Sequence, residues 1–146
     1  MSRIERSIVI DRPAEEVFTF LHDAGKDPMW QTTLVESEPV TDGPPRVGTQ
    51  IREVRRFLGL RVEMTRELTE YAPPAASSFK VVSGPVPIAG GYVLESANGG
   101  TRLTATGNLD AHGFFKLAEP VFARMAGREL ETSLDHLKDL LESSRA

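Results

Sequence analysis

The sequence predicts an α+β domain, in which a curved antiparallel sheet of about seven strands wraps around a long C-terminal helix, with one or two short helices after the first strand. Short segments of alternating apolar and polar residues are separated by turns rich in glycine and proline, a pattern typical of a half-buried antiparallel sheet. From about residue 114 the apolar period changes to that of a helix. The length of 146 residues suits a single domain over residues 1–146.

The first strand and the helix after it are indicated by local signals. Residues 3–10 alternate, and Asp11 then stands near the cap of a helix with Pro13 at its first position. Two glutamates in the first turn favour the helix dipole. One apolar face follows at helical spacing: Ala14, Val17, Phe18 and Leu21. The helix is expected to end within residues 22–25, and residues 26–30 to form a further short turn.

Turn signals divide the middle of the chain into six more strands. We expect them at residues 32–40, 48–57, 60–71, 78–83, 89–97 and 101–110. Leu58-Gly59 and Asn98-Gly99 each join two alternating segments, and Asn-Gly is the strongest short-range signal for a hairpin. Proline breaks at residues 44–45, 73–74 and 85–87 separate the others.

The last third of the chain predicts one long helix over residues 114–141. Its apolar residues recur mostly at steps of three or four: Ala118, Phe122, Met125, Leu130, Leu134, Leu137 and Leu141. Pro120 lies inside this stretch, so we expect an irregular first turn or a kink there. At 1.5 Å per residue, residues 120–141 alone would extend about 33 Å.

Composition excludes several classes of site. The chain has no cysteine, which excludes disulfides, thiolate nucleophiles and cysteine-bound metals. A net charge of −4 disfavours nucleic acid as a partner. The three histidines have no metal-ligand spacing, and no glycine-rich phosphate loop is present, so no metal and no cofactor are expected. No segment has the length of a membrane span or the pattern of a secretory signal, which predicts a cytoplasmic protein.

The first hairpin places charged residues on its apolar face. A two-residue turn at Leu58-Gly59 pairs residue 57 with 60 and residue 53 with 64, and directly opposed side chains share a face. The more apolar face, which should point inward, carries Ile51, Glu53, Arg55, Phe57, Val62, Met64, Arg66 and Leu68. A register shifted by one residue would group Ile51 and Phe57 with charged residues instead. We therefore expect Glu53, Arg55 and Arg66 inside the curved sheet.

Two interpretations of this inward trio remain open. A buried charge is costly unless it is paired, so the three residues should pair with one another or line a wet pocket. They are either an ion-pair cluster that holds the sheet together, or a site where one arginine orients a carboxylate, enol or carbonyl oxygen of a bound molecule.

The second hairpin supplies the apolar surroundings. Pairing of residue 97 with 100 turns Tyr92, Leu94, Leu103, Ala105 and Gly107 inward. Phe79 and Val81 are expected beside them, with Phe115, Phe122 and Met125 of the long helix opposite. Tyr92 could donate a hydrogen bond to a ligand or be a core tyrosine with a satisfied hydroxyl.

Several short motifs, taken in order, resemble a known superfamily. They are Ile8-Val-Ile-Asp-Arg-Pro-Ala-Glu-Glu-Val-Phe18, Asp23 with Pro28 and Trp30, Val47-Gly-Thr49, Gly84-Pro85, Gly100-Thr-Arg-Leu103, Leu137-Lys138 and Leu141-Glu142. Their order and spacing resemble the helix-grip superfamily (START-like, or SRPBCC), and within it most closely the small bacterial polyketide cyclase/dehydrase-like proteins. The resemblance covers nearly the whole chain. In that pattern Trp30 plugs the base of the core, although it could also touch ligand.

The resemblance implies a cavity that binds a small hydrophobic molecule, lipid-like or polyketide-like. Its expected lining comprises Trp30, Glu53, Arg55, Met64, Arg66, Phe79, Val81, Tyr92, Phe115, Phe122 and Met125. One alternative is a cyclase or dehydratase acting on a polyketide-like carbonyl compound, with Arg55 or Arg66 stabilising an enolate. A second is a co-chaperone-like interaction module. Binding is favoured because the sequence shows no acid/base machinery, and it identifies no catalytic residue.

Overall fold

The computed structural model describes residues 2–57, 59–84, 87–109 and 119–143. Seven strands form one antiparallel sheet in the order β1-β7-β6-β5-β4-β3-β2. The strands are β1 (Ser2–Ile10), β2 (Leu34–Pro39), β3 (Gln50–Phe57), β4 (Leu60–Ala72), β5 (Ala76–Ser83), β6 (Ile88–Ala97) and β7 (Gly100–Leu109). The helices are α1 (Ala14–Leu21), the 3₁₀ helix η1 (Ala24–Met29) and α2 (Glu119–Ser143). The predicted fold class and element order are confirmed.

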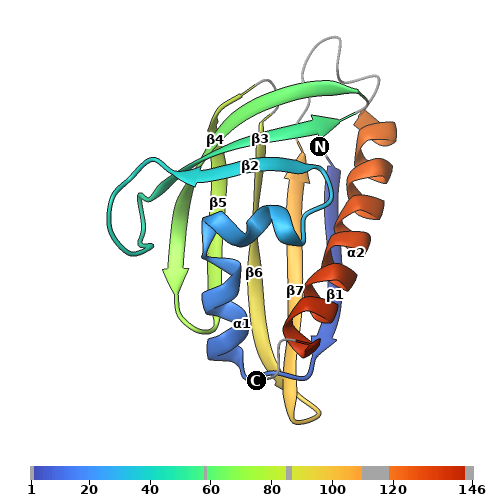
Figure 1. Cartoon of the computed structure of the whole chain (residues 1–146). Helices are drawn as coiled ribbons and strands as arrows, with labels where there is room; N and C mark the ends of the chain where they lie inside the picture. The colour runs from blue at the N-terminus through green and yellow to red at the C-terminus, as the bar shows by residue number, and fades with distance from the viewer. Residues whose placement is uncertain (1, 58, 85–86, 110–118, 144–146) are drawn as a thin grey trace.

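The sheet is strongly curved, and α2 runs beside β1 on its concave side (Figure 1). Strands β2, β3 and β4 bend across the end of the sheet where α2 begins, whereas α1 lies near the opposite end (Figure 1). The helix η1 connects α1 to β2 and packs against that strand. No helix in the described ranges is both long enough and apolar enough to cross a membrane.

Helix α1 begins one position later than predicted. Helix α1 begins at Ala14, so Pro13 is the capping residue in place of Asp11, and it makes no side-chain hydrogen bond. The capping position needs an extended backbone, which Pro13 adopts with a ψ of 151°. The described part of α2 begins at Glu119 and includes Pro120, while residues 114–118 of the predicted helix lie outside the described ranges.

The register predicted for both hairpins is confirmed. In the first, Glu53 pairs with Met64 and Ile51 with Arg66. In the second, Tyr92 pairs with Ala105 and Leu94 with Leu103, across a turn in which Asn98 adopts a φ of 51°. Glycine and asparagine are the residues that tolerate such positive φ values, so the turn residues determine the register.

Three irregularities were not predicted. Strand β2 has a register shift against β3 between Leu34 and Glu36. Strand β4 has two shifts against β5, and beyond the second of them Tyr71 pairs with Ser77. An extra residue in β4 changes which of its side chains face inward, and Tyr71 thereby joins the inner face opposite Ser77, which alternates with Phe79 on β5.

The packed core occupies one end of the molecule. It brings together α1, the C-terminal half of α2 and strands β1, β6 and β7 around Trp30. Its buried members are Ile10, Val17, Phe18, Leu21, Trp30, Leu94, Leu103, Ala105, Leu134, Leu137 and Leu141. In the N-terminal half of α2, Phe122 and Met125 are only half-buried. The helix is therefore tightly packed against the sheet along its second half and less tightly along its first.

Candidate functional site

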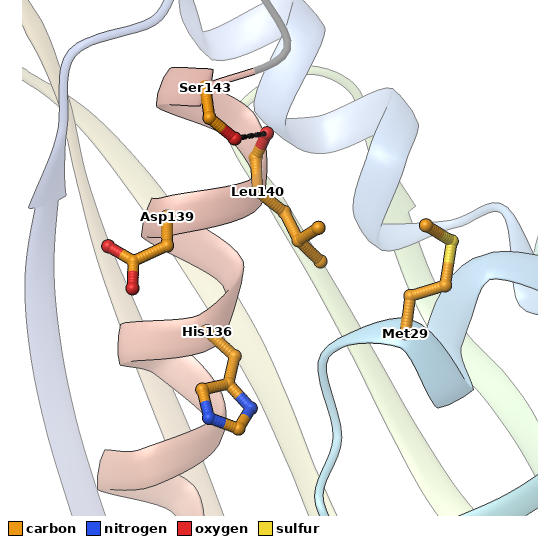
Figure 2. Close-up of a pocket in the computed structure, with 5 residues that line it drawn as sticks. All are labelled: Met29, His136, Asp139, Leu140 and Ser143. Atoms are coloured by element: carbon orange, nitrogen blue, oxygen red, sulfur yellow. Dashed lines mark hydrogen bonds between the residues drawn. The ribbon is translucent and has the colours of Figure 1, made fainter.

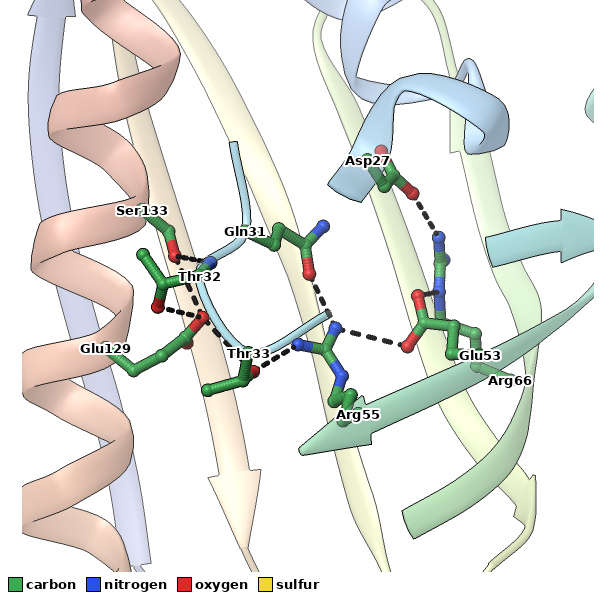
Figure 3. A network of polar contacts seen from close by, with 9 residues as sticks. All are labelled: Asp27, Gln31, Thr32, Thr33, Glu53, Arg55, Arg66, Glu129 and Ser133. Carbon is green, nitrogen blue, oxygen red and sulfur yellow. Dashed lines mark hydrogen bonds and ion pairs between the residues drawn. The ribbon is translucent and has the colours of Figure 1, made fainter. Parts of the chain in front are cut away.

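The structure places Glu53 between the two predicted arginines (Figure 3). Arg66 donates from Nε to Glu53 Oε2 at 2.9 Å, and Arg55 donates from Nη2 to Oε1 at 3.1 Å. The Glu53 side chain is 2% exposed, that of Arg66 12% and that of Arg55 23%. All three lie on the inner face because strands β3 and β4 pair in the predicted register.

A fourth charged residue, Asp27 of η1, completes this cluster and was not predicted from the sequence. Its side chain is 1% exposed, and its Oδ2 lies 3.5 Å from Nη2 of Arg66 (Figure 3). Its other oxygen, Oδ1, is buried without a hydrogen-bond partner among the described residues. No pattern in the sequence indicates the burial of this side chain, because a six-residue 3₁₀ helix is too short to show an apolar periodicity.

The two carboxyl groups of the cluster differ in their pKa values. Burial raises the pKa of Asp27 to about 7, against the attraction of Arg66, and the neighbouring Glu53 raises it further. The Trp30 indole favours the charged form of Asp27 and so acts to lower its pKa. Nε1 of Trp30 nevertheless has no well-formed hydrogen bond to the described residues. Burial alone would raise the pKa of Glu53, but Arg55 and Arg66 together lower it below its ordinary value. Glu53 is therefore the fixed anion of the cluster, and Asp27 titrates near neutrality.

Among the described residues, Arg66 and Tyr92 each keep a donor without a protein partner. Arg66 uses Nε for Glu53 and Nη2 for Asp27, whereas Nη1 donates no hydrogen bond within the described part of the chain. Phe79 lies under the guanidinium, with Cζ 5.4 Å from the ring centroid. The Tyr92 hydroxyl likewise has no hydrogen-bond partner among those residues. It is not a fully buried atom, so solvent can reach it. Burial raises the Tyr92 pKa, so its phenol stays neutral and able to donate.

Arg55 connects the cluster to the segment between η1 and β2. Its Nη2 donates to Gln31 Oε1 at 2.5 Å and its Nη1 to Thr33 Oγ1 at 3.0 Å (Figure 3). No sequence pattern indicates these contacts, because they link residues more than twenty positions apart through side chains on an irregular segment.

The same segment is attached to α2 by Glu129 and Ser133 (Figure 3). Ser133 donates to Glu129 Oε1 at 2.8 Å and accepts the backbone N–H of Thr32 at 3.1 Å. The hydroxyls of Thr32 and Thr33 also approach Glu129, at 3.4 and 3.5 Å. A continuous polar network therefore runs from the buried Asp27 across the sheet to the helix.

His22 lies deep in the molecule as a neutral side chain. Its Nδ1 is 2.7 Å from the Phe18 carbonyl and its Nε2 is 2.8 Å from Ser77 Oγ. Burial lowers the His22 pKa, and the nearby Arg66 lowers it further, against the carbonyl contact. In the neutral tautomer Nδ1–H donates to the carbonyl and Ser77 donates to Nε2. Both ring nitrogens are occupied, so His22 braces the packed end of the molecule.

The predicted apolar lining is only partly brought together. Half-buried side chains occur at Met64, Phe79, Val81, Tyr92, Phe122 and Met125. Trp30 is instead 1% exposed and belongs to the packed core. Phe115 lies outside the described residues.

Two facing glycines give a local measure of the space at the sheet. Gly107 of β7 pairs with Gly90 of β6 and lies on the inner face with Ala105. A Cβ atom added at Gly107 would meet no atom of the described residues within 4 Å. A Cβ atom at Gly90 would lie 2.2 Å from the Thr106 carbonyl oxygen. Among the described residues, nothing occupies the space above Gly107, a position where the alternation requires an inward side chain.

A second, shallow pocket lies on the outside of the molecule, between η1 and the C-terminal half of α2. It is lined by Met29, His136, Asp139, Leu140 and Ser143 (Figure 2). Ser143 is occupied by a hydrogen bond to the Leu140 carbonyl at 3.3 Å. None of the predicted lining residues contributes to this pocket. Across the described ranges, no group of three acidic or histidine side chains could hold a metal ion.

Residues 1–142 match the family described as polyketide cyclase/dehydrase and lipid transport. Among solved structures, TTHA0849 from Thermus thermophilus superposes with a TM-score of 0.85 at 20% identity, covering 98% of this chain and all of that one. A START superfamily protein from Mycobacterium smegmatis gives a TM-score of 0.80 at 15% identity, over 98% and 99% of the two chains.

The di-domain ARO/CYC protein BexL from the BE-7585A biosynthetic pathway gives a TM-score of 0.77 at 23% identity. The match covers 97% of this chain and 47% of BexL. At these identities the three structures establish likeness of fold. No curated protein matches the sequence significantly. The family match, by contrast, spans nearly the whole sequence, and the resemblance predicted from the short motifs is confirmed: the chain belongs to the polyketide cyclase/dehydrase and lipid transport family.

Proposed function

We propose that the protein binds a small, largely apolar molecule that carries one polar group. The molecule occupies a recess between the concave face of the sheet and the N-terminal half of α2. Arg66 and Tyr92 hold its polar group. The observation that carries this proposal is that both side chains lie deep in the molecule and still keep donors without a protein partner within the described residues.

Neither Arg66 Nη1 nor the Tyr92 hydroxyl is among the fully buried atoms that lack a partner in the described part of the chain, so each can still bond to water or to a bound molecule. Both groups keep some accessible surface, and Arg66 is 12% exposed. A side chain that is surrounded by protein but still reached by solvent lies on the wall of a recess. An oxygen of a bound molecule at this place would accept from both donors.

The remaining walls suit an apolar body. Met64, Phe79 and Val81 on the sheet and Phe122 and Met125 on the helix are half-buried. The space above Gly107 extends the same inner face. Apolar walls with a small number of polar groups are the usual composition of a small-molecule site. The family description, which includes polyketide chemistry and lipid transport, agrees with such a ligand.

Native mass spectrometry of the purified protein should reveal co-purified molecules, and titration with a neutral naphthylamine fluorophore should saturate at one site. Tyr92→Phe removes one donor and is expected to weaken binding of oxygen-containing ligands by about fivefold to tenfold, the value of one hydrogen bond. Arg52→Gln alters an arginine on the outer face, which pairs with Glu63, and should leave binding unchanged. Absence of any saturable binding would contradict the proposal.

A cyclase or dehydratase is the second candidate, and Asp27 is the observation that favours it. A carboxyl group with a pKa of about 7 lies behind Arg66, so it can change the charge around a guanidinium that faces the recess. Arg66 or Arg55 would stabilise the enolate of a polyketide-like carbonyl substrate. Single Arg55→Gln and Arg66→Gln variants separate the candidates. Loss of turnover with retained affinity supports catalysis, and equal loss of affinity supports binding.

A further inference from the structure

We propose that the polar group of the ligand is a carboxylate held by Arg66, and that its binding is accompanied by uptake of one proton at Asp27. This inference rests on the proposed function and specifies the chemical class of ligand for the same site. It follows from the charge balance of the buried cluster and from the way the Arg66 guanidinium is shared.

The cluster is electrically balanced when all its members are ionised. It contains two guanidinium groups, Arg55 and Arg66, and two carboxylates, Glu53 and Asp27. A ligand carboxylate would add one negative charge to a site with little water, which is unfavourable. Transfer of one proton from solvent to the Asp27 carboxylate, with formation of one O–H bond, restores the balance.

The geometry makes Asp27 the group that yields. Glu53 accepts from both arginines at 2.9 and 3.1 Å, whereas Asp27 Oδ2 is 3.5 Å from its arginine and Oδ1 has no hydrogen-bond partner in the described part of the chain. The edge of Arg66 formed by Nη1 and Nη2 can bind a carboxylate with two parallel hydrogen bonds. A ligand bound in this way competes with Asp27 for Nη2, so the charge of Arg66 is then shared among Glu53, Asp27 and the ligand, and Asp27 is the most weakly held of the three.

The titratable groups that face Asp27 come from several elements. Arg66 lies on β4, Glu53 and Arg55 on β3, and Tyr92 on β6, while Trp30 follows on the same segment as Asp27. His22 of α1 lies near Arg66.

Among these groups, only Asp27 changes charge between pH 6 and pH 8. Its pKa is raised to about 7 by burial. Arg66 has a raised pKa and stays charged, the pKa of Glu53 is lowered, and that of Tyr92 is raised. The His22 pKa is lowered by burial, which favours the neutral ring, and the Asp27→Asn variant tests whether any remaining proton uptake comes from His22. A proton bound with the ligand in this pH range is therefore assigned to Asp27.

Isothermal titration calorimetry with decanoate and with decan-1-ol tests the inference. The two probes share one chain length and differ in the charged group, and decanoate is ionised at both pH 6 and pH 8. If the carboxylate binds only when Asp27 is protonated, its affinity falls about tenfold from pH 6 to pH 8, because the protonated fraction falls from about nine tenths to about one tenth. Repeating the pH 8 titration in two buffers of different ionisation enthalpy should show uptake of about 0.9 proton. Decan-1-ol should show neither effect.

Asp27→Asn keeps the size of the side chain and removes its charge. In this variant decanoate should bind with the same affinity at pH 6 and pH 8 and without proton uptake. Asp23→Asn, which alters an exposed aspartate four positions earlier, is the matched control and should keep the pH dependence of the wild type. The wild-type calorimetry decides the question even if the Asp27 variant does not fold.

The outcomes distinguish this inference from the proposed function. Equal binding of both probes with no proton uptake would overturn the carboxylate and its proton linkage, and would leave the recess as a binding site. Binding of the alcohol alone would overturn the ligand class in the same way. If neither probe binds and the naphthylamine fluorophore also fails to bind, the proposed function itself is wrong, and this inference with it.

Discussion

Glu53 is the residue on which the inner cluster of charges depends, because it neutralises two arginines at once. Glu53→Gln would leave both guanidinium groups short of a negative partner in a place with little water. Removal of one partner from a buried ion pair typically lowers the free energy of unfolding by about 3–5 kcal/mol, and we expect a loss of that order in urea denaturation at pH 7.

The control for Glu53 is Glu63→Gln on the outer face of β4. Glu63 accepts from Arg52 at 2.9 Å, which is as short as the inner contact between Glu53 and Arg66. Water surrounds this outer pair and screens its charges, so a much smaller change is expected. Equal losses in the two variants would show that the inner cluster does not behave as a buried one.

Asp27 and Glu53 contribute to stability with opposite dependence on pH. The pKa of Glu53 is lower in the folded state than in the unfolded chain, so its contribution is present above pH 4.5 and is lost as the pH falls through its folded pKa. The pKa of Asp27 is raised from 3.8 to about 7. Its folded state therefore holds a proton more tightly, and its contribution declines as the pH rises from about 4 to about 7.

Asp27→Asn should remove this decline. Between pH 5 and pH 8 the wild type loses stability relative to the variant by roughly 3 kcal/mol, because the decline spans about two pH units below the folded pKa at roughly 1.4 kcal/mol for each unit. Thermal denaturation of both proteins at the two pH values measures the difference. A constant difference between them would mean that Asp27 does not titrate in this range.

The sequence predicted the inward trio, because strand alternation and a two-residue turn determine the direction of Glu53, Arg55 and Arg66. It could not predict Asp27, whose position depends on how the short 3₁₀ helix η1 packs against β2. Gln31 could not be predicted either, because it lies on the irregular segment between η1 and β2. Regular elements make the direction of a side chain readable from sequence, and irregular segments do not.

At the scale of elements, substitutions at the paired Gly90 and Gly107 distinguish the effect of close backbone packing from the effect of filling the proposed recess. Gly107→Val adds a β-branched side chain to a strand, where the added Cβ meets no described atom within 4 Å. We expect little change in the melting temperature and a loss of at least about tenfold in fluorophore affinity, because the side chain occupies the recess.

The matched control for Gly107→Val is the neighbouring Gly90→Ala. Its Cβ would lie 2.2 Å from a backbone oxygen of β7. That variant should be destabilised by about 1–3 kcal/mol through strain. A strongly destabilised Gly107 variant would indicate that the space above β7 is filled in solution.

Ser133 joins α2 to the segment before β2. Ser133→Ala removes the acceptor of the Thr32 N–H and a donor to Glu129, and we expect a loss of about 1–3 kcal/mol. Hydrogen exchange should accelerate at the Thr32 amide. Ser143→Ala near the end of α2 removes an exposed hydroxyl and should leave that amide unchanged. Unchanged exchange at Thr32 in the Ser133 variant would contradict this attachment.

The hairpins were readable from the sequence, whereas the irregularities of β2 and β4 were not. A turn with a glycine or asparagine at positive φ has a local signature. A bulge depends on how two strands fit across the curvature of the whole sheet, and no residue type marks it here. The inward position of Tyr71 follows from such a bulge in β4 and could not be predicted.

At the scale of the whole molecule, the core unites residues from both ends of the chain. Arg12 donates to the Glu142 carbonyl, and Lys138 donates to the Val9 carbonyl and to Glu142. These contacts attach the end of α2 to the end of β1. We therefore expect one cooperative unfolding unit, with coincident transitions by Trp30 fluorescence and far-UV circular dichroism and equal calorimetric and van't Hoff enthalpies. Separate transitions for the two signals would contradict a single domain.

Strand β2 is an edge strand of the sheet. An exposed edge strand can pair with a strand of another molecule, so the form of β2 matters for aggregation. It is six residues long, its pairing with β3 is interrupted between Leu34 and Glu36, and it ends at Pro39. Glu36 and Glu38 are exposed along it. A short margin with a bulge, acidic side chains and a proline is a poor template for an incoming strand. The form of β2 therefore disfavours edge-to-edge polymerisation along this strand.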